Sequence, residues 1–464
     1  MNEEGIKDNW TDDLTKVVTS WDYSNIPKNF NDQIKLAILD TLAVALAAQS
    51  LPDVQQMNFL YQGQSRGSGQ LWWSQKKVSP LDAAFLNSYA SHRLDFDCIM
   101  YGTYGHPTIM LLPVLSSMYS DLELNGEDLI NATIIGLEFM SVIGSVFGES
   151  LRINRLHPTP ILGGLASTAA LGWMLNFSKK QMDSALSLTS STVIGFKSSF
   201  GSIAKPYQVG MATRASLASA MTIFNNQEVN LQDTWLSNLK LISGNKFSNY
   251  PVKRFGDPWI LNHFNFMFKY YPCCGYFHHA MNELQRVLHS SNVSFGNLYK
   301  VKLVLPRFIK DASIYERPKN FTESQFSIHF NAGLVIAFGE ATLDYFTEEY
   351  VHDYHVLKAM NMIEIEYREN EDCINEENLF SGKAYLYTSS GEVFEDQLIL
   401  SDYGTPTDFN RMIKKFTECA NPYLTDVQIS EFLELILNLE ETISKDWRSF
   451  WNNMVINKKH FKKY

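Results

Sequence analysis

Apolar residues recur at helical spacing through most of the first 225 residues of the chain. In residues 31–47 an Asn-Asp start is followed by apolar residues every three or four positions, from Ile34 to Leu46. Further helical segments are expected at 81–92, 126–147, 159–174, 179–193 and 206–225. Small residues are dense from 160 to 220, which lets helix axes approach closely. The pattern predicts that this half of the chain is all-helical.

The spacing of the apolar residues changes after about residue 268. Residues 299–306 and 362–367 alternate apolar and polar positions as half-buried strands do, and residues 383–398 read as a hairpin around a Ser-Ser-Gly turn. Helical segments are expected between these strands, at 276–289 and 322–338, and again at the end, at 408–451. The chain is therefore predicted to be mainly α, with a smaller α+β unit and closing helices that pack back on the first part.

Composition excludes several classes of protein. A chain of 464 residues favours two domains, and a net charge of −11 argues against a nucleic-acid partner. The five cysteines lack structural-zinc spacing, so we expect no metal and a reduced Cys273–Cys274 pair. Residues 129–146 contain Glu138 and are interpreted as a buried helix rather than a membrane span. The acidic N-terminus does not look like a signal peptide, and a cytoplasmic protein without a membrane partner is expected.

One tripeptide occurs twice, as His106-Pro107-Thr108 and as His157-Pro158-Thr159, each time before a long apolar segment. Proline is favoured at the first helical position, so each histidine should lie at the start of a buried helix. Free N–H groups and the helix dipole attract anions there and favour a neutral imidazole, which suits proton transfer. A simple capping role is the alternative for either histidine.

Other polar groups stand out from the apolar background. Asp95-Phe96-Asp97 places two acids on one side of a turn, and Lys205 precedes a helix-initiating proline. The segment from Lys269 to His279 combines a lysine, tyrosines and two histidines where the helical half meets the α+β half. Tyr315 follows the strand at 299–306. Imidazole, ammonium, carboxylate and phenol groups together suit acid–base chemistry beside a carboxylate: loss of water, loss of carbon dioxide, or epimerisation.

These residues, in this order, resemble the MmgE/PrpD superfamily, which includes 2-methylcitrate dehydratase, cis-aconitate decarboxylase and iminodisuccinate epimerase. The resemblance runs from about Ile34 to the end and rests on ILDTLAVALA, SHRLDFD with GHPTIMLLPVL, RLHPTPILGGLASTAAL, AKPYQVGMATRASLAS and YPCCGYFHHAMNEL. It implies a large helical domain built from both chain ends (1–268 and 406–464), an α+β lid domain (269–405) and a homodimer. It also implies an interdomain cleft that holds a small di- or tricarboxylate without a metal, an iron–sulfur cluster or another cofactor.

The resemblance also assigns roles to residues. His106 would be the chief acid–base group, with Asp95 orienting it or sharing its proton, while Lys205 and His157 would hold carboxylates. His278 and Tyr315 would complete the cleft and donate protons. Further substrate-binding candidates are Lys269, Tyr207 and Gln208.

This chain departs from the family pattern at four positions: Cys98 and Ile99 replace Asp-Thr, Gln208 replaces a histidine, and Gly275 replaces a residue that is often basic. Each change makes the pocket less polar or less cationic. The sequence favours a lyase that removes water by abstracting a proton beside a carboxylate, similar to 2-methylcitrate dehydratase. A decarboxylase or an epimerase on the same scaffold is the alternative, and a non-catalytic carboxylate-binding protein is a third hypothesis.

Overall fold

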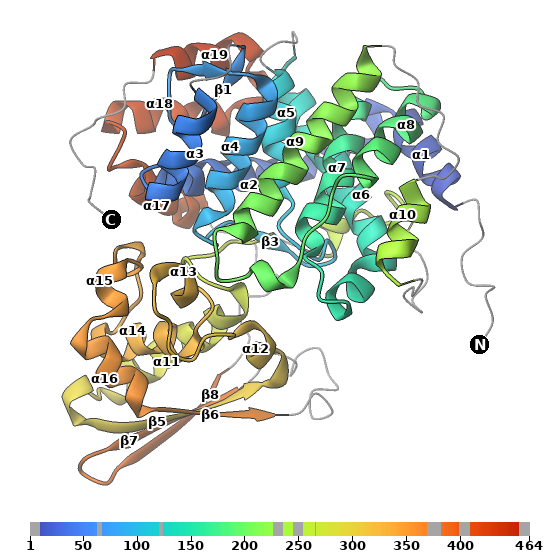
Figure 1. Cartoon of the computed structure of the whole chain (residues 1–464). Coiled ribbons are helices and arrows are strands. Elements are labelled where there is room, and N and C mark those ends of the chain that lie inside the picture. The colour runs from blue at the N-terminus through green and yellow to red at the C-terminus, as the bar shows by residue number, and fades with distance from the viewer. Residues whose placement is uncertain are drawn as a thin grey trace, which may run out of the picture.

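The computed structural model describes residues 10–62, 67–119, 124–225, 235–244, 254–264, 266–368, 382–398 and 409–453. Its larger part is a body of helices, and its smaller part is a four-stranded sheet covered by helices (Figure 1). The prediction of a mainly α chain is confirmed.

Helices from both regions of the chain form the body. From the N-terminal region come α1 (Trp10–Ser20), α2 (Asn31–Ala48), α3 (Pro52–Gln62), α4 (Pro80–Arg93), α5 (Thr108–Tyr119), α6 (Gly126–Ile153), α7 (Pro158–Met174), α8 (Lys179–Ser190), α9 (Ala204–Phe224) and α10 (Trp235–Ile242). From the C-terminal region come α17 (Phe409–Ala420), α18 (Asp426–Leu437) and α19 (Ser444–Asn453). In Figure 1 the red C-terminal helices lie beside the blue N-terminal ones, and α17 and α18 pack on α2.

The helices of the body pack closely because their contact faces carry small residues. At Gly136 of α6, a Cβ atom would come within 2.3 Å of Leu111 on α5. At Gly210 of α9, it would come within 2.8 Å of the ring of Phe85 on α4. The many small residues between 160 and 220 therefore let the helices approach each other closely, as predicted.

Helix α6 is long and apolar enough to cross a membrane, but 94% of its most apolar window is buried inside the fold. It begins with a capping box, in which Asn125 and Asp128 bond each other's backbone N–H groups. Its buried Glu138 accepts hydrogen bonds from the N–H groups of Gly256 and Ile260, at 3.0 and 2.7 Å. The interpretation of 129–146 as a buried core helix is confirmed.

The prediction that the first half is all-helical was wrong in detail. Three two-residue strands occur there: β1 (Gly69–Gln70) pairs antiparallel with β2 (Lys77–Val78), and β3 (Ile99–Met100) pairs antiparallel with β4 (Phe266–Met267), which lies later in the chain. A strand of two residues is too short to show alternation. The β3–β4 pair matters most, because it ties the segment after Asp97 to the chain that leads into the smaller part.

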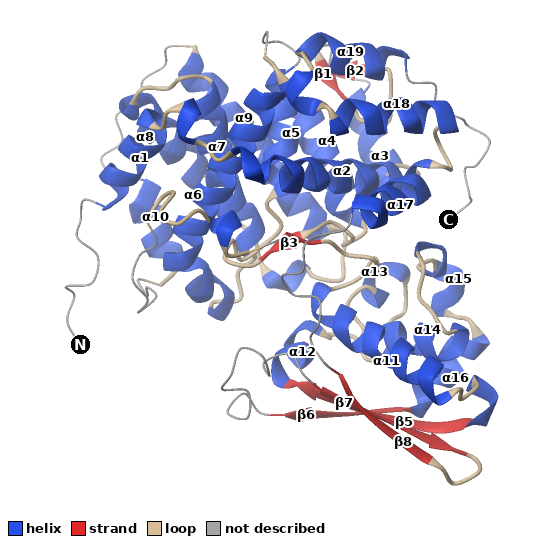
Figure 2. Ribbon diagram, turned by 180° about the vertical axis from the view of Figure 1, so that it is seen from behind, coloured by secondary structure: helices blue, strands red, loops and turns tan. Residues whose placement is uncertain are grey.

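The smaller part contains a sheet in the order β6-β5-β7-β8, built from β5 (Leu298–Pro306), β6 (Ile363–Arg368), β7 (Gly382–Thr388) and β8 (Val393–Leu398). Strand β5 is parallel to β6 and antiparallel to β7, and β7 and β8 form the expected hairpin. The helices of this part are α11 (His278–Ser291), α12 (Arg307–Ala312), α13 (Phe321–Ser324), α14 (Ile328–Phe338), α15 (Glu348–Val351) and α16 (Tyr354–Met362). Figure 2 shows α11, α14 and α16 on one face of the sheet.

The two faces of this sheet follow the alternation in the sequence. Val301 and Leu303 of β5 are buried toward the helices. Lys300 and Lys302 lie on the other face and form ion pairs of 2.6 and 2.7 Å with carboxylates of β6. The predicted helix at 322–338 is in fact two helices, because Ser327 caps a new helix by accepting a bond from the N–H of Phe330.

The described cysteines Cys98, Cys273, Cys274 and Cys419 are free thiols, as predicted for the Cys273–Cys274 pair, and Cys373 lies outside the described residues. The limits predicted for the domains at 268 and 405 stay a prediction, and residue 405 also lies outside the described residues.

Candidate active site

A cavity of about 560 Å³ lies where the helical body meets the smaller part. The segment before α5 and the starts of α7 and α9 line it from one side, and the segment before α11 together with α12 lines it from the other. Five of the predicted site residues line this cavity: Asp95, His106, His157, Lys205 and Lys269.

The two histidine–proline helix starts differ in detail. Pro158 is the first residue of α7, as predicted, and His157 is the N-cap residue. Pro107 instead precedes α5, and its carbonyl accepts the first helical bonds, from the N–H groups of Met110 and Leu111. The side chain of His157 makes no capping hydrogen bond, so a capping role does not explain its presence.

Asp95 lies between two lysines. Lys205 Nζ lies 2.5 Å from its Oδ1, while Lys269 Nζ lies 3.2 Å from its Oδ2 and 2.8 Å from its backbone carbonyl oxygen. Burial alone would raise the pKa of the Asp95 carboxyl, but the two ammonium groups outweigh burial and hold this pKa well below its usual value. The residues that line the cavity carry one positive charge in excess, which suits an anionic ligand; the cations are Arg152, Lys197, Lys205 and Lys269, and the acids are Asp95, Glu149 and Asp311.

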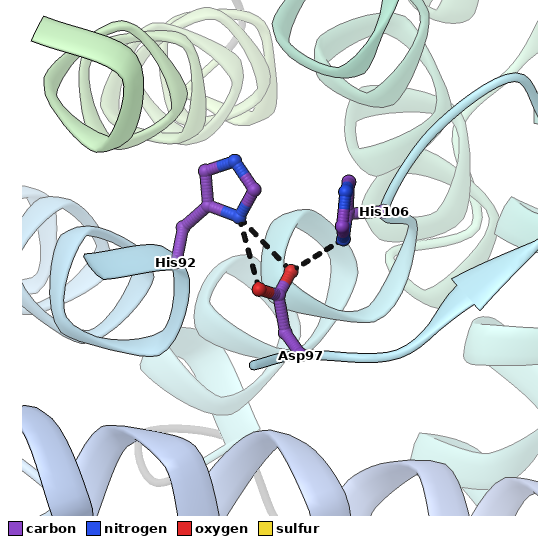
Figure 3. A group of neighbouring side chains, drawn as sticks. All are labelled: His92, Asp97 and His106. Atoms are coloured by element: carbon purple, nitrogen blue, oxygen red, sulfur yellow. Dashed lines mark hydrogen bonds and ion pairs between the residues drawn. The ribbon is translucent and has the colours of Figure 1, made fainter. Parts of the chain in front are cut away.

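Asp97 contacts two histidines (Figure 3). Its Oδ2 lies 2.7 Å from His106 Nδ1, and its two oxygens lie 3.0 and 3.1 Å from His92 Nδ1. The two rings meet edge to face, with centroids 4.8 Å apart. The structure thus places Asp97, and not Asp95, in direct contact with His106, while Asp95 pairs with the two lysines; that Asp95 orients His106 or shares its proton stays a prediction.

The electrostatics of the second group fix its proton positions. Burial would raise the pKa of Asp97, but the adjacent imidazoles outweigh burial and hold this pKa well below its usual value. The same burial lowers the pKa of His92 to about 4, although Asp97 opposes the shift. A nitrogen lone pair that faces an ionised carboxylate at 2.7–3.1 Å would be repelled. At His92, Nδ1 therefore carries the proton and Nε2 has the free lone pair. At His106, Nδ1 lies within ion-pair distance of the Asp97 carboxylate but is not aligned for a hydrogen bond to it.

Within the described ranges, one group of side chains has the residue types and spacing to hold a metal ion: His92, Asp97 and His106. Their ligand atoms lie within 4.8 Å of one another. The direct contacts between nitrogen and oxygen give each Nδ1 the carboxylate as its partner. We therefore interpret the group as a proton-sharing cluster.

His157 faces the same space. Its ring lies nearly parallel to that of His92, with centroids 6.0 Å apart, and its Nδ1 lies 3.4 Å from Gln208 Oε1. Burial, followed by the positive charge of Lys205, lowers the pKa of His157 well below its usual value, so this imidazole is neutral. Gln208 does not line the cavity. Its Oε1 accepts bonds from Phe196 N–H at 3.0 Å and from Ser199 Oγ at 3.3 Å, so it holds the wall behind His157.

Three other predicted residues lie outside the cavity lining. Tyr207 is 40% exposed on the outer face of α9 and packs edge to face on Phe85. His278 is buried against the ring of Tyr271, at a centroid distance of 5.0 Å, and burial lowers its pKa well below the usual value. Tyr315 lies against Gly201, and its hydroxyl is 3.5 Å from the carbonyl oxygen of Phe200.

A clamp from both ends of the chain holds the segment that carries the two acids. Lys415 of α17 lies 2.6 Å from Asp40 of α2, and both side chains are buried. Lys415 Nζ also donates to the carbonyl of Phe96 at 2.8 Å, and Asp40 accepts from the N–H of Cys98 at 2.8 Å. The backbone of Phe96 and Cys98 is thereby fixed to the helical body. The acids that alternate with them, Asp95 and Asp97, are therefore available to the site. Asp95 itself adopts a left-handed backbone, with φ of 47°.

Sequence reasoning missed two groups. His92 was assigned only to a helix, although it precedes Asp97 by five residues in the quoted SHRLDFD motif. Lys197 lines the cavity, is half-buried, and has no ion pair or hydrogen bond from its ammonium group to any residue in the described ranges. It lies in a short turn without a recognisable pattern, so no signal in the sequence could have identified it.

Comparison with known proteins identifies the family of the chain. The model of the MmgE/PrpD N-terminal domain matches residues 12–228, and that of the MmgE/PrpD C-terminal domain matches residues 271–441. Cis-aconitate decarboxylase of Homo sapiens is 23% identical over 387 residues, which cover 80% of this chain and 79% of that protein. The Mus musculus protein of the same name is 26% identical over 251 residues, covering 51% of this chain and 50% of that protein. Cis-aconitate decarboxylase-like protein oryM of Aspergillus oryzae is 20% identical over 461 residues, covering 93% and 95%. With both domain models matched over most of its length, the chain belongs to the MmgE/PrpD family.

Proposed function

We propose that this protein is a lyase that removes carbon dioxide from a small unsaturated tricarboxylate of the cis-aconitate type, with His106 as the proton-transfer group. The observation that carries the proposal is the division of one cavity into a charged wall and an aromatic wall. Asp95, His106, Lys205 and Lys269 lie on the charged side. The names of the three relatives support the choice of substrate class.

The aromatic wall suits a departing carboxylate. Tyr276 and Phe308 line the cavity and meet edge to face, with ring centroids 5.1 Å apart. A carboxylate that is held by lysines on one side of the substrate stays in place. A carboxylate that lies against rings has few groups to stabilise its charge, and loss of carbon dioxide removes that charge.

The proposed step balances without a further reactant except a proton. The carbon–carbon bond to the departing carboxylate breaks, and its electron pair forms a new double bond to the neighbouring carbon. The electrons of the original double bond take a proton at their far carbon, supplied by Nε2 of the imidazolium form of His106, which takes up this proton from solvent before the step. Carbon dioxide leaves, a dicarboxylate with a shifted double bond remains, and Asp97 stabilises the imidazolium form of His106 at Nδ1.

Two cations beyond the Asp95 pair add to the binding of the remaining carboxylates. Lys197 contributes an ammonium group that has no partner among the residues that the structure describes, and Arg152 at the end of α6 also lines the cavity, paired with Glu149 at 2.7 Å. Of the departures from the family pattern, Ile99 and Gly275 line the cavity, whereas Cys98 and Gln208 do not. Of the four departures from the family pattern, only these two thus make the surface of the cavity less polar or less cationic.

Dehydration, which the sequence favoured, needs an acid that protonates the departing hydroxyl. The neutral His157 is a weak acid, and Tyr315, the phenol predicted to donate a proton, lies outside the cavity lining. This difference is our reason for placing decarboxylation before dehydration and epimerisation.

The test is to incubate the purified protein with cis-aconitate, 2-methylcitrate and citrate in separate reactions and to identify the products by mass spectrometry. We expect loss of carbon dioxide from cis-aconitate, and a fall of about 10²–10⁴-fold in turnover for His106→Gln. The matched control is His329→Gln, at a half-buried histidine of α14 that does not line the cavity. Loss of water from 2-methylcitrate with no reaction of cis-aconitate would refute the proposal and return the assignment to a dehydratase.

We also propose that the protein is a cytoplasmic homodimer. Ile203, Tyr207 and Met211 recur at helical spacing along the outer face of α9 and are 46%, 40% and 39% exposed, which suits contact with a second copy. Light scattering on the purified chain tests the dimer, because a monomer at micromolar concentration would contradict it.

A further inference from the structure

The cluster of His92, Asp97 and His106 contains one residue that the reaction above does not use. His92 is 1% exposed and does not line the cavity, so it cannot touch a bound substrate. Its Nδ1 is bonded to the same carboxylate that contacts His106. One carboxylate thus contacts two imidazoles (Figure 3). His106 lines the cavity, whereas His92 is enclosed by the protein.

Stability alone does not account for His92. Its Nε2 is buried without a hydrogen-bond partner among the residues that the structure describes, and an unsatisfied buried nitrogen disfavours the folded state. A hydrophobic side chain in this place would avoid that cost. What His92 contributes is a second N–H donor to Asp97, which limits how the carboxylate can rotate and how much of its charge is directed at His106.

We propose that His92 is a positioning residue that acts through Asp97 to fix the ring orientation and the Nδ1–H tautomer of His106. The inference deepens the proposed function and rests on it only for the assignment of His106 as the proton-transfer group. In this arrangement Nε2 of His106 is the nitrogen that exchanges a proton with substrate in either direction. The shared carboxylate prevents the ring from flipping into the tautomer in which Nε2 carries the proton.

The geometry gives two opposite expectations. Asp97→Asn removes the negative charge beside His106 and replaces one of the two acceptor oxygens by an amide nitrogen that cannot accept, so the pH at which His106 titrates should fall. His92→Leu leaves the negative charge of Asp97 in place but removes the N–H group that His92 donates to it. The carboxylate charge then acts on His106 more strongly, so the titration of His106 should move to higher pH. His92→Asn has nearly the shape of His92→Leu and keeps a donor near the position of Nδ1, so it should behave like the unchanged protein. The other groups near this cluster, Asp95, Lys205 and His157, stay the same in every variant.

The experiment combines ¹⁵N NMR of histidine-labelled protein with kinetics, and the His106 signal is assigned by its loss in His106→Gln. We expect the Nδ1–H tautomer in the unchanged protein, opposite titration shifts in Asp97→Asn and His92→Leu, and recovery in His92→Asn. On cis-aconitate, kcat should fall about 10²-fold or more in Asp97→Asn and about tenfold in His92→Leu, with KM within threefold. His329→Leu serves as the control for loss of a histidine outside the cluster.

Three results would overturn the inference. The first is an Nε2–H tautomer of His106 in the unchanged protein, which needs no variant to fold. The second is the same titration in His92→Leu and His92→Asn. The third is a stoichiometric metal in the purified protein that is lost in Asp97→Asn, which would make the cluster a metal site. Because the NMR titration uses no substrate, failure of the inference stays distinguishable from failure of the decarboxylase assignment.

Discussion

Replacing Lys415 by methionine tests the clamp that holds the acid-bearing segment. The substitution keeps most of the length of the side chain and removes the ammonium group, which lies 2.6 Å from Asp40 in the unchanged protein. Asp40 then remains fully buried without a counter-charge. It also frees the carbonyl of Phe96 and removes the cation that lies 3.8 Å from the centroid of the Phe96 ring. Removing one partner of a buried pair costs about 3–5 kcal/mol of the free energy of unfolding. Since domains of this kind have about 5–15 kcal/mol in total, the variant should unfold at a clearly lower urea concentration.

The sign of the pH dependence follows from Asp40. Burial raises the pKa of its carboxyl despite the attraction of Lys415, so the folded protein binds a proton there more readily than the unfolded chain does. Ionised Asp40 is thus a net cost near pH 7, and its contribution to the free energy of unfolding rises as pH falls from the raised folded pKa toward about 4, the ordinary value. In Lys415→Met this rise should be larger than in the unchanged protein, because the attraction that opposed burial is gone.

The assay is urea unfolding followed by tryptophan fluorescence at pH 7 and pH 5. Asp40→Asn combined with Lys415→Met removes both charges and should recover most of the loss, to within about 1 kcal/mol of the unchanged protein. Lys414→Met is the matched control, since this neighbouring side chain is 77% exposed and its change should stay within about 0.5 kcal/mol. A loss below about 1 kcal/mol in Lys415→Met, or a double variant no more stable than the single one, would refute the reasoning.

Three further predictions concern the cavity. Lys197→Met should raise KM for the carboxylate substrate about tenfold with kcat nearly unchanged, whereas Lys414→Met should change neither in steady-state kinetics. Gly148→Ala should lower kcat and the melting temperature together, because its Cβ would lie 2.3 Å from the ring of Tyr104 and displace the turn before His106; unchanged kinetics would contradict this packing argument. Cys274 lines the cavity, yet burial raises its pKa to about 11, so mass spectrometry after iodoacetamide treatment at pH 7.5 should find it unmodified in native protein and alkylated in urea.

Much of the helical body could be predicted because its helices are long and periodic. Helix α2, for example, begins at the predicted Asn31, and α7 and α9 begin within two residues of the predicted starts. The two-residue strands could not be predicted, because alternation needs more positions than they have. The break before α14 was missed because the apolar pattern continues through it, and only the Ser327 cap interrupts the helix.

The candidate site was predictable as a set of residue types and not as a set of contacts. The two histidine–proline motifs, Asp95, Lys205 and Lys269 were found from the sequence, and all line one cavity. Which acid serves which base depends on contacts across the fold: Lys205 is 110 residues from Asp95, and Lys269 is 174 residues from it. No local spacing carries that information, and this is why the orienting role was given to Asp95 and not to its neighbour two positions later.

The clamp at Lys415 also determines when, during synthesis of the chain, the segment with the two acids can be fixed in place. Its ammonium group bonds the carbonyl of Phe96, 319 residues earlier in the chain. A ribosome adds about 5–20 residues per second, so roughly 16–64 s separate the synthesis of these two residues. During that interval the helices that follow Phe96 can already fold, but the turn with both acids lacks the partner that fixes its carbonyl. A newly made chain should therefore acquire catalytic competence late, when its last helices dock, and remain inactive while it is still being translated.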